Sequence, residues 1–248
     1  MTHTVPTEPA EPPVPAEPPV PAATIRTQVQ IPLRFPDGFA TPARVFTFEG
    51  LVDDGQHLAL GLGDRAGSVP GATGVPLVRL HSECLTGDVL GSQRCDCGPQ
   101  LREAVELIAG AGGYLLYLRQ EGRGIGLYAK IDAYALQDTG LDTYQANLAL
   151  GHREDERDYT AAAQMLQALG ASSVRLLSNN PDKARQLTRC GVNVLDQLPT
   201  GVHLCAANSR YLATKVRHGA HMLHLPDLGK AEQVGVTRLA SRGPVDPE

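Results

Sequence analysis

Residues 101–118 read LREAVELIAGAGGYLLYL, and this stretch joins a helical pattern to a strand pattern. Its apolar residues first recur at i, i+3, i+4 and i+7, from Leu101 to Ile108, so they share one face of a helix. Tyr114–Leu118 is then a short, mostly apolar run, which is typical of a buried strand. This junction predicts that helices and strands alternate in this half of the chain.

The same alternation continues downstream of the quoted stretch. Helical spacing returns at Ala162–Leu169 and stops at Gly170, a residue suited to a C-terminal helix cap. Val174–Leu177 and Val192–Leu195 are predicted strands. Between them, the Asn-Pro pair at 180–181 predicts the N-cap and the first residue of another helix.

Upstream of the quoted stretch, short β-like runs are separated by turns rich in Pro, Gly and Asp. Four strands are predicted there: Thr27–Leu33, Arg44–Phe48, Leu58–Leu62 and Pro76–His81. The predicted fold class is therefore α+β. A β-rich N-terminal half is followed by alternating helices and strands in a single compact domain.

The two ends of the chain differ in composition from its body. Residues 1–23 contain eight prolines, and the hexamer EPPVPA occurs twice, at 11–16 and 17–22. So few apolar groups do not offset the entropy of ordering, which predicts a disordered tail. A proline-rich ligand for a partner protein is the alternative. A last helix is expected at Tyr211–Leu223, with a polar tail at 226–248, so the folded domain is expected to span 24–225.

Composition and charge narrow the class of protein. The 248 residues are 42% hydrophobic and 20% charged, which is ordinary for a soluble globular protein. No apolar run of 18 residues and no secretory signal is present, so we expect a cytoplasmic protein with no membrane partner. The net charge is −5, and three of the acids lie in the N-terminal tail. The nearly neutral body argues against nucleic-acid binding, whereas a small phosphorylated ligand needs only a few local cations.

Three of the five cysteines, Cys84, Cys95 and Cys97, lie within fourteen residues. Soft thiolates select zinc or an iron–sulfur cluster. Structural zinc usually has four protein ligands, whereas catalytic zinc has three and leaves one position for water. Three clustered thiolates therefore favour a catalytic zinc. The chain must bend between Cys95 and Cys97, and Gly98 is expected to help that turn.

Two alternatives to an open zinc site remain. Cys190 or Cys205 would close the site as a fourth ligand, or the clustered thiols would be metal-free core residues. Cys190 lies at the end of an apolar helical pattern, so we expect it to pack in the core.

Four segments together resemble GTP cyclohydrolase II. They are RLHSECLTGD at 79–88, GSQRCDCG at 91–98, RQEGRGIGL at 119–127 and SNNP at 178–181. The resemblance runs from about residue 27 to residue 223. It implies the monofunctional form, because the 23 residues ahead of it are too few for the second domain that often accompanies this family.

The resemblance implies an activity and its cofactors. Cys84, Cys95 and Cys97 would hold one catalytic Zn²⁺ per chain, and Mg²⁺ would accompany the GTP triphosphate. Water on the zinc would attack C8 of guanine, and the ring would open with release of formate and pyrophosphate. The implied product is 2,5-diamino-6-ribosylamino-4(3H)-pyrimidinone 5′-phosphate, in the first step of riboflavin synthesis. The family also implies a homodimer.

The resemblance further assigns catalytic roles to Asp155, Arg157 and Tyr134. The family's Asp-x-Arg element matches the first two, with the Asp as proton acceptor and the Arg at the α-phosphate. One role for Arg157 is that of a nucleophile at this phosphate. Because a guanidinium is almost always protonated, the alternative is that Arg157 stabilises the phosphate charge as an electrostatic clamp. Tyr134 matches a tyrosine near the reacting base, although it is equally suited to a helix core. Without the resemblance, this charged segment reads as a solvated loop whose Asp158 caps the next helix.

Substrate contacts are implied for twelve positions that match the family. They are Arg79, Leu80, His81, Ser82, Glu83, Gln100, Glu121, Gly122, Arg123, Thr143, Ser178 and Lys183. A carboxylate near guanine would accept from its N1–H and its exocyclic amine. For the glycine-rich segment 120–126, a tight strand-to-helix turn is the plain structural alternative.

Two other functions are compatible with the same residues. A paralogue would bind GTP and zinc but stop at a partial product. A non-catalytic zinc module would bind protein or nucleic acid, and it would need a fourth zinc ligand and a basic face.

Overall fold

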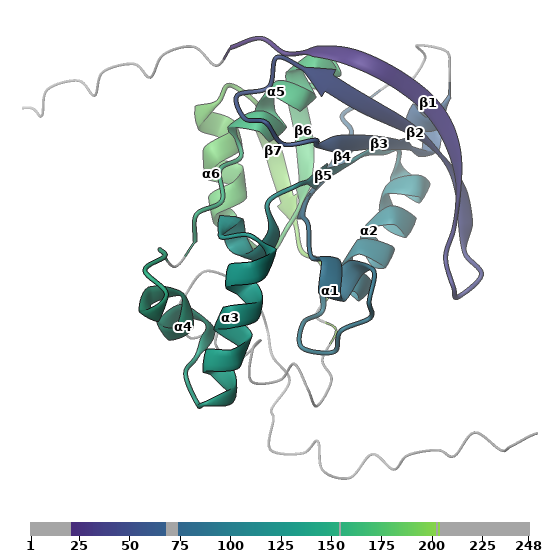
Figure 1. The fold of residues 1–248 in the computed structure, drawn as a ribbon. Helices are drawn as coiled ribbons and strands as arrows, with labels where there is room; N and C mark the ends of the chain where they lie inside the picture. The colour runs from purple at the N-terminus through teal and green to yellow at the C-terminus, as the bar shows by residue number, and fades with distance from the viewer. Residues whose placement is uncertain (1–20, 68–73, 154, 202, 204–248) are drawn as a thin grey trace, which may run out of the picture.

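A seven-stranded mixed sheet forms the core of the protein (Figure 1). The computed structural model describes residues 21–67, 74–153, 155–201 and 203. The strands are β1 (Thr24–Arg34), β2 (Ala40–Glu49), β3 (Leu58–Leu62), β4 (Leu77–Ser82), β5 (Gly113–Leu118), β6 (Ser173–Leu177) and β7 (Asn193–Leu198). Their order is β1-β2-β3-β5-β4-β6-β7. The β1, β2, β3 and β5 strands pair antiparallel, whereas β5, β4, β6 and β7 pair parallel.

Helices cover both faces of the parallel half of the sheet (Figure 1). They are α1 (Leu85–Asp88), α2 (Cys97–Ala111), α3 (Leu127–Asp138), α4 (Thr143–Ala149), α5 (Thr160–Ala168) and α6 (Pro181–Arg189). Successive strand residues point to opposite faces. Leu115 therefore packs with α2, whereas Leu116 packs with α5 and α6. Each face thus has its own apolar core.

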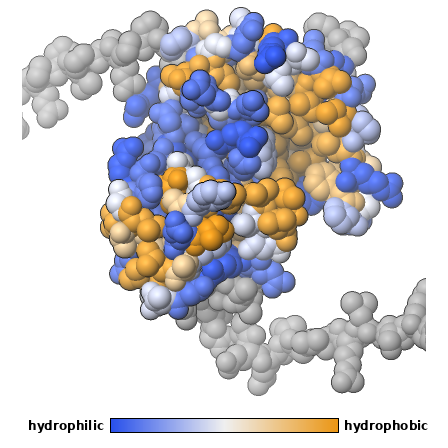
Figure 2. Space-filling view, viewed as in Figure 1, coloured by the Kyte–Doolittle hydropathy of each residue, from blue (hydrophilic) through white to orange (hydrophobic). Residues whose placement is uncertain are grey.

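The β1–β2 hairpin extends along one side of the molecule (Figure 1). Every residue of β1 except Leu33 is exposed, and Val29 and Ile31 are exposed apolar residues of this edge strand. A second exposed apolar region lies over α3 and α4, where Ile131 and Leu148 face solvent (Figure 2).

The predicted fold class is confirmed. Every strand predicted within the described residues is present, and so are the helices expected after Gly98, before Gly170 and after Asn180. The Asn180 side chain caps α6, with Pro181 as the first helical residue. The short helices α1 and α4 were not predicted. The expected helix Tyr211–Leu223, the first 20 residues of the N-terminal tail and the tail at 226–248 lie outside the described residues. Among the described residues, no helix is long and apolar enough to cross a membrane.

Candidate active site

Three parallel strands end side by side at one edge of the sheet. The strands β5, β4 and β6 are followed there by residues 119–126, 83–88 and 178–183. Ligands of α/β sheets bind beyond the carboxyl ends of such strands. These segments border a pocket with about 1140 Å³ of empty space, counted with its open mouth.

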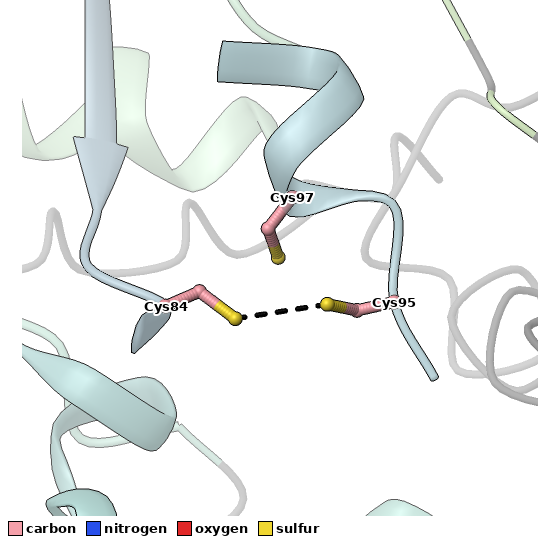
Figure 3. Close-up of side chains that lie close together, drawn as sticks. All are labelled: Cys84, Cys95 and Cys97. Carbon is pink, nitrogen blue, oxygen red and sulfur yellow. Dashed lines mark hydrogen bonds between the residues drawn. The ribbon is translucent and has the colours of Figure 1, made fainter. Parts of the chain in front are cut away.

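Three sulfur atoms converge in this pocket (Figure 3). Cys84 follows β4, Cys95 lies in the next loop, and Cys97 is the first residue of α2. All three Sγ atoms lie within 4.8 Å of one another, and those of Cys84 and Cys95 are 3.6 Å apart. Tetrahedral zinc with Zn–S bonds of about 2.3 Å requires sulfur atoms about 3.8 Å apart. The donor set and its spacing therefore fit a zinc ion.

The fourth-ligand alternative finds no support among the described residues. No further His, Cys, Asp or Glu joins the three cysteines there. Cys190 lies at the end of α6 and packs against the apolar core, as expected from its pattern. Cys205 lies outside the described residues.

Two glycines allow the cluster to form. A Cβ on Gly87 would lie 2.7 Å from the Cys95 sulfur and 3.1 Å from that of Cys84. A Cβ on Gly98 would lie 2.4 Å from the carbonyl oxygen of Gly87. The expected role of Gly98 in a turn is therefore wrong. It lies inside α2, and glycine is required there because α2 packs directly against the backbone of α1.

The three thiols shift one another's pKa. Hydrogen bonds from Cys95 and Cys97 lower the pKa of Cys84, and the nearby Lys130 lowers it further. Hydrogen bonds with Cys84 and Cys95, together with burial, raise the pKa of Cys97. The amino-terminal end of α2 adds a favourable partial charge beside Cys97, because helix N-termini favour thiolates.

A buried carboxylate holds the backbone at the first cysteine. Asp88 accepts hydrogen bonds from the Cys84 backbone N–H at 2.9 Å and from the Tyr117 hydroxyl at 2.9 Å. It also contacts His81 Nε2 at 3.1 Å. Burial lowers the pKa of His81 even though Asp88 opposes that shift, and burial together with Asp88 raises the pKa of Tyr117. A neutral His81 beside a carboxylate carries its proton on Nε2.

Asp155 and Arg157 form a two-pronged ion pair at the pocket wall. Asp155 Oδ1 accepts from the backbone N–H of Arg157 at 3.1 Å and from its Nε at 2.8 Å, while Nη2 donates to Oδ2. Although burial opposes the shift, these contacts lower the pKa of Asp155. The pair therefore holds its charges as carboxylate and guanidinium.

The turn after β5 has an unusual backbone. Gly122 and Arg123 both have φ of +63°, which is the left-handed region, and Arg123 is the one non-glycine residue there within the described chain. The backbone carbonyl of Arg123 accepts from Glu156 N–H at 2.9 Å, and its guanidinium lies over the Tyr144 ring. Non-glycine residues in this region cost free energy and cluster at functional sites. This turn joins the glycine-rich segment to the segment of the ion pair.

Further buried cations line the pocket. Arg79 donates to Gln100 Oε1 at 2.9 Å and to the Leu177 carbonyl at 3.2 Å. Lys183 donates to the Leu80 carbonyl at 2.6 Å from the first turn of α6. Buried positive charge in an open pocket favours an anionic ligand.

Most of the predicted site residues line this one pocket. They are Arg79, Leu80, His81, Ser82, Glu83, Cys84, Cys95, Cys97, Gln100, Glu121, Gly122, Arg123, Tyr134, Thr143, Arg157 and Lys183. Two predicted residues, Asp155 and Ser178, do not. Asp155 is paired with Arg157, which does line the pocket, and the buried Ser178 hydroxyl accepts from the Asn180 backbone N–H at the start of α6.

Several lining residues were not singled out from the sequence. They include Lys130, Asn147, Asn179 and Thr200. Lys130 lies four positions before Tyr134 on α3, so the helix face that carries Tyr134 points to it. Asn179 lies inside the quoted SNNP motif, whereas no pattern in the sequence pointed to Asn147 or Thr200.

Comparison with known proteins identifies relatives across most of the chain. A profile of the GTP cyclohydrolase II family matches residues 26–199. A "GTP cyclohydrolase-2" of Vibrio cholerae serotype O1 is 51% identical over 183 residues, covering 74% of this chain and 90% of the relative. One from Pseudomonas aeruginosa is 50% identical over 196 residues, with coverages of 77% and 93%. One from Psychromonas ingrahamii is 46% identical over 203 residues, with coverages of 81% and 98%. The matched family span includes the three cysteines and the Asp155–Arg157 pair.

Proposed function

The chain belongs to the GTP cyclohydrolase II family of hydrolases, and we propose that it opens the imidazole ring of GTP at C8. The products are formate, pyrophosphate and 2,5-diamino-6-ribosylamino-4(3H)-pyrimidinone 5′-phosphate. This reaction is the first step of riboflavin synthesis. The observation that carries this proposal is the shared pocket, in which three convergent thiols lie beside buried cations. Hydrolysis of the ring needs the thiols as metal ligands, and binding of the triphosphate needs the cations.

In this proposal Cys84, Cys95 and Cys97 hold one zinc ion per chain. When bound there, zinc supplies the Lewis acidity that makes a water molecule a nucleophile at neutral pH. The protein's own part is to hold three soft donors at zinc spacing while the pocket stays open on the remaining side.

The cationic side chains bind the triphosphate. Lys183 and Arg123 line the pocket, and Mg²⁺ bound with the substrate offsets further phosphate charge. Arg157 acts on the α-phosphate as an electrostatic clamp. This role is supported by its ion pair with Asp155, because a carboxylate held against a guanidinium keeps it protonated and opposes its use as a nucleophile.

Tyr134 lies between two cations. Its ring is 4.6 Å from the Arg94 guanidinium carbon and 5.7 Å from Lys130 Nζ. We propose that it contacts the guanine base, since it lines the pocket beside the sulfur cluster. We also propose a cytoplasmic homodimer, for which the exposed apolar side chains of α3 and α4 offer a contact surface.

The test is to incubate zinc-loaded protein with GTP and Mg²⁺ and to identify every product by mass spectrometry. Formate, pyrophosphate and the diaminopyrimidine monophosphate together support the full reaction. Pyrophosphate with a formylated monophosphate, but without formate, indicates a paralogue that stops early. Intact GTP in the presence of one zinc per chain overturns the catalytic proposal and favours a binding module.

A further inference from the structure

A buried ammonium group lies directly beside the sulfur cluster. Lys130, on α3, is only 9% exposed. Its Nζ donates to Cys84 Sγ at 3.1 Å, to Thr86 Oγ1 at 3.0 Å and to Glu121 Oε1 at 2.7 Å. An ammonium group has three N–H donors, so each donor has an acceptor inside the protein. Lys130 is therefore fully engaged before any substrate binds.

Its carboxylate partner also makes three hydrogen bonds within the protein. Glu121 Oε1 accepts from Lys130 and from the Gly122 backbone N–H at 3.1 Å, and its Oε2 accepts from the Leu85 backbone N–H at 2.7 Å. Glu121 is 8% exposed. The two oxygens of a carboxylate offer about four acceptor sites, and three of these are occupied within the protein. A two-pronged contact with the N1–H and the exocyclic amine of guanine would therefore require this buried carboxylate to release one of its bonds, which costs free energy. The geometry thus favours a structural role over the substrate contact implied by the resemblance.

The pair joins three segments at one point. Glu121 belongs to the turn after β5, Lys130 belongs to α3, and Leu85 is the residue directly after the first cysteine. Loss of one partner of a buried ion pair strongly destabilises a protein, because the other charge is left buried and unpaired. Both partners therefore hold the segments that carry them in one arrangement. Here that arrangement fixes both the sulfur and the backbone of the first ligand.

We propose that Lys130 and Glu121 are positioning residues for the metal centre. Lys130 holds the Cys84 sulfur through an N–H···S hydrogen bond, and Glu121 fixes Lys130 and the Leu85 backbone. Three thiolates around Zn²⁺ carry a net charge of −1, and the ammonium offsets that charge inside the protein. This inference deepens the proposed function and rests on the zinc site within it.

The test compares metal binding in matched variants. Lys130→Met removes the donor but leaves Glu121 as an unpaired buried charge. The double variant Lys130→Met/Glu121→Gln removes both charges, so it separates a metal effect from failure to fold, which circular dichroism checks. Lys183→Met is the matched control, because it removes another buried lysine of the same pocket that donates to a backbone carbonyl and to no sulfur among its described bonds.

Two readouts are independent of turnover. Competition with a chromophoric chelator gives zinc affinity, and the Co²⁺-substituted protein gives the thiolate-to-cobalt charge-transfer band. In the double variant we expect zinc affinity to fall by about tenfold or more, as for other residues that support metal ligands. The band should move to lower energy, because a sulfur without its hydrogen bond gives up an electron more readily. Lys183→Met should weaken GTP binding and leave both metal readouts unchanged.

A folded double variant with wild-type zinc affinity and a wild-type cobalt band would overturn the inference. An equal band shift in Lys183→Met would also overturn it, because the effect would then follow pocket charge in general. Failure of the wild-type protein to bind either Zn²⁺ or Co²⁺ would contradict both the inference and the proposed function. Wild-type protein that binds zinc but leaves GTP intact would contradict the proposed function alone. Comparison of the cobalt charge-transfer band in the wild type and the variants would still decide the role of Lys130.

Discussion

Single residues set the space available at the proposed metal centre, and Gly87 does so by having no side chain. A Cβ there would lie 2.7 Å from the Cys95 sulfur and 3.1 Å from the Cys84 sulfur. Real Cβ atoms essentially never approach sulfur at the shorter distance. The substitution Gly87→Ala should therefore abolish or severely weaken zinc binding while the sheet and helices still form. Zinc content after dialysis and circular dichroism measure the two effects.

Gly110→Ala is the control for that experiment. Gly110 lies in α2, and a Cβ there meets nothing within 4 Å. Alanine is more favourable than glycine inside a helix by up to about 1 kcal/mol. This variant should keep its zinc and become slightly more stable. Equal zinc content in the two variants would contradict the steric argument.

Arg157 gives a second prediction at this scale, because its two suggested roles, electrostatic clamp and nucleophile, require different properties of the side chain. A clamp needs a positive charge, so Arg157→Lys should keep more activity than Arg157→Met. Loss of one electrostatic contact of this kind costs roughly 100- to 1,000-fold in kcat. Steady-state kinetics measure this ranking. Intact mass spectrometry of wild-type enzyme quenched during turnover should show no nucleotidyl adduct, and a persistent adduct would establish the nucleophile instead.

His81 gives a prediction about pH. Burial lowers the pKa of His81, so the unfolded chain binds its proton more readily than the folded protein does. The stability contributed by neutral His81 is therefore present above its unfolded pKa of about 6.5 and is lost as pH falls through that value toward the folded one. His81→Gln keeps an amide donor for Asp88 but does not titrate. With zinc in excess, the melting temperature of wild type relative to this variant should fall between about pH 7.5 and pH 5.5. Parallel curves would show that His81 does not titrate with folding.

The sequence reveals some of these residues and conceals others for a physical reason. Cys84, Cys95 and Cys97 are close along the chain, and few residue types bind zinc, so their spacing predicts the site. Lys130 is 46 positions from the sulfur it contacts. A lysine in an amphipathic helix ordinarily faces solvent, and only the packing of α3 shows that this one is buried.

At the scale of elements, α4 carries Thr143 and Asn147 into the pocket and depends on its cap. Asp142 accepts from the backbone N–H groups of Tyr144 and Gln145 at 2.9 Å, and the Gln145 side chain accepts from the backbone N–H of Asp142. A seven-residue helix is marginal without such contacts. Asp142→Ala should destabilise α4 by about 1 kcal/mol.

That loss should appear locally rather than in the whole fold. Amide hydrogen exchange in α4 should accelerate, and KM for GTP should rise because two pocket residues are held less firmly. Asp142→Ser keeps a capping oxygen, so it should behave nearly as wild type. Unchanged exchange in Asp142→Ala, or an equal rise of KM in both variants, would contradict the cap's role.

Long elements were predictable and short ones were not. The fifteen residues of α2 show several turns of apolar periodicity, and the strand before residue 119 shows an apolar run. The four residues of α1 and the seven of α4 are too short for a periodic pattern. The α4 helix contributes Thr143 and Asn147 to the pocket, and α1 begins directly after Cys84.

For the whole molecule, strand order decides which segments meet at the site. The order β5-β4-β6 places residues separated by 103 positions at one edge, as in the hydrogen bond from Lys183 to the Leu80 carbonyl. Local patterns give the strands but do not give their order, because several orders bury the same apolar residues. The resemblance to a known family implied the site residues, and the fold explains why most of them line one pocket.

The boundary of the folded unit gives the last prediction. Gln164, fully buried in α5, donates to the Pro21 carbonyl at 2.8 Å and to the Gly50 carbonyl at 3.2 Å, and it accepts from the Val52 N–H at 2.7 Å. Deleting residues 1–20 keeps all three bonds, so melting temperature, zinc content and GTP turnover should stay at wild-type values. Deleting residues 1–23 removes the Pro21 acceptor and should cost on the order of 1 kcal/mol, since a buried donor loses a partner. Urea denaturation measures the difference. A loss of stability or turnover already in the shorter deletion would mean that the proline-rich segment packs on the domain, and equal stability of both deletions would show that the Pro21 contact contributes nothing.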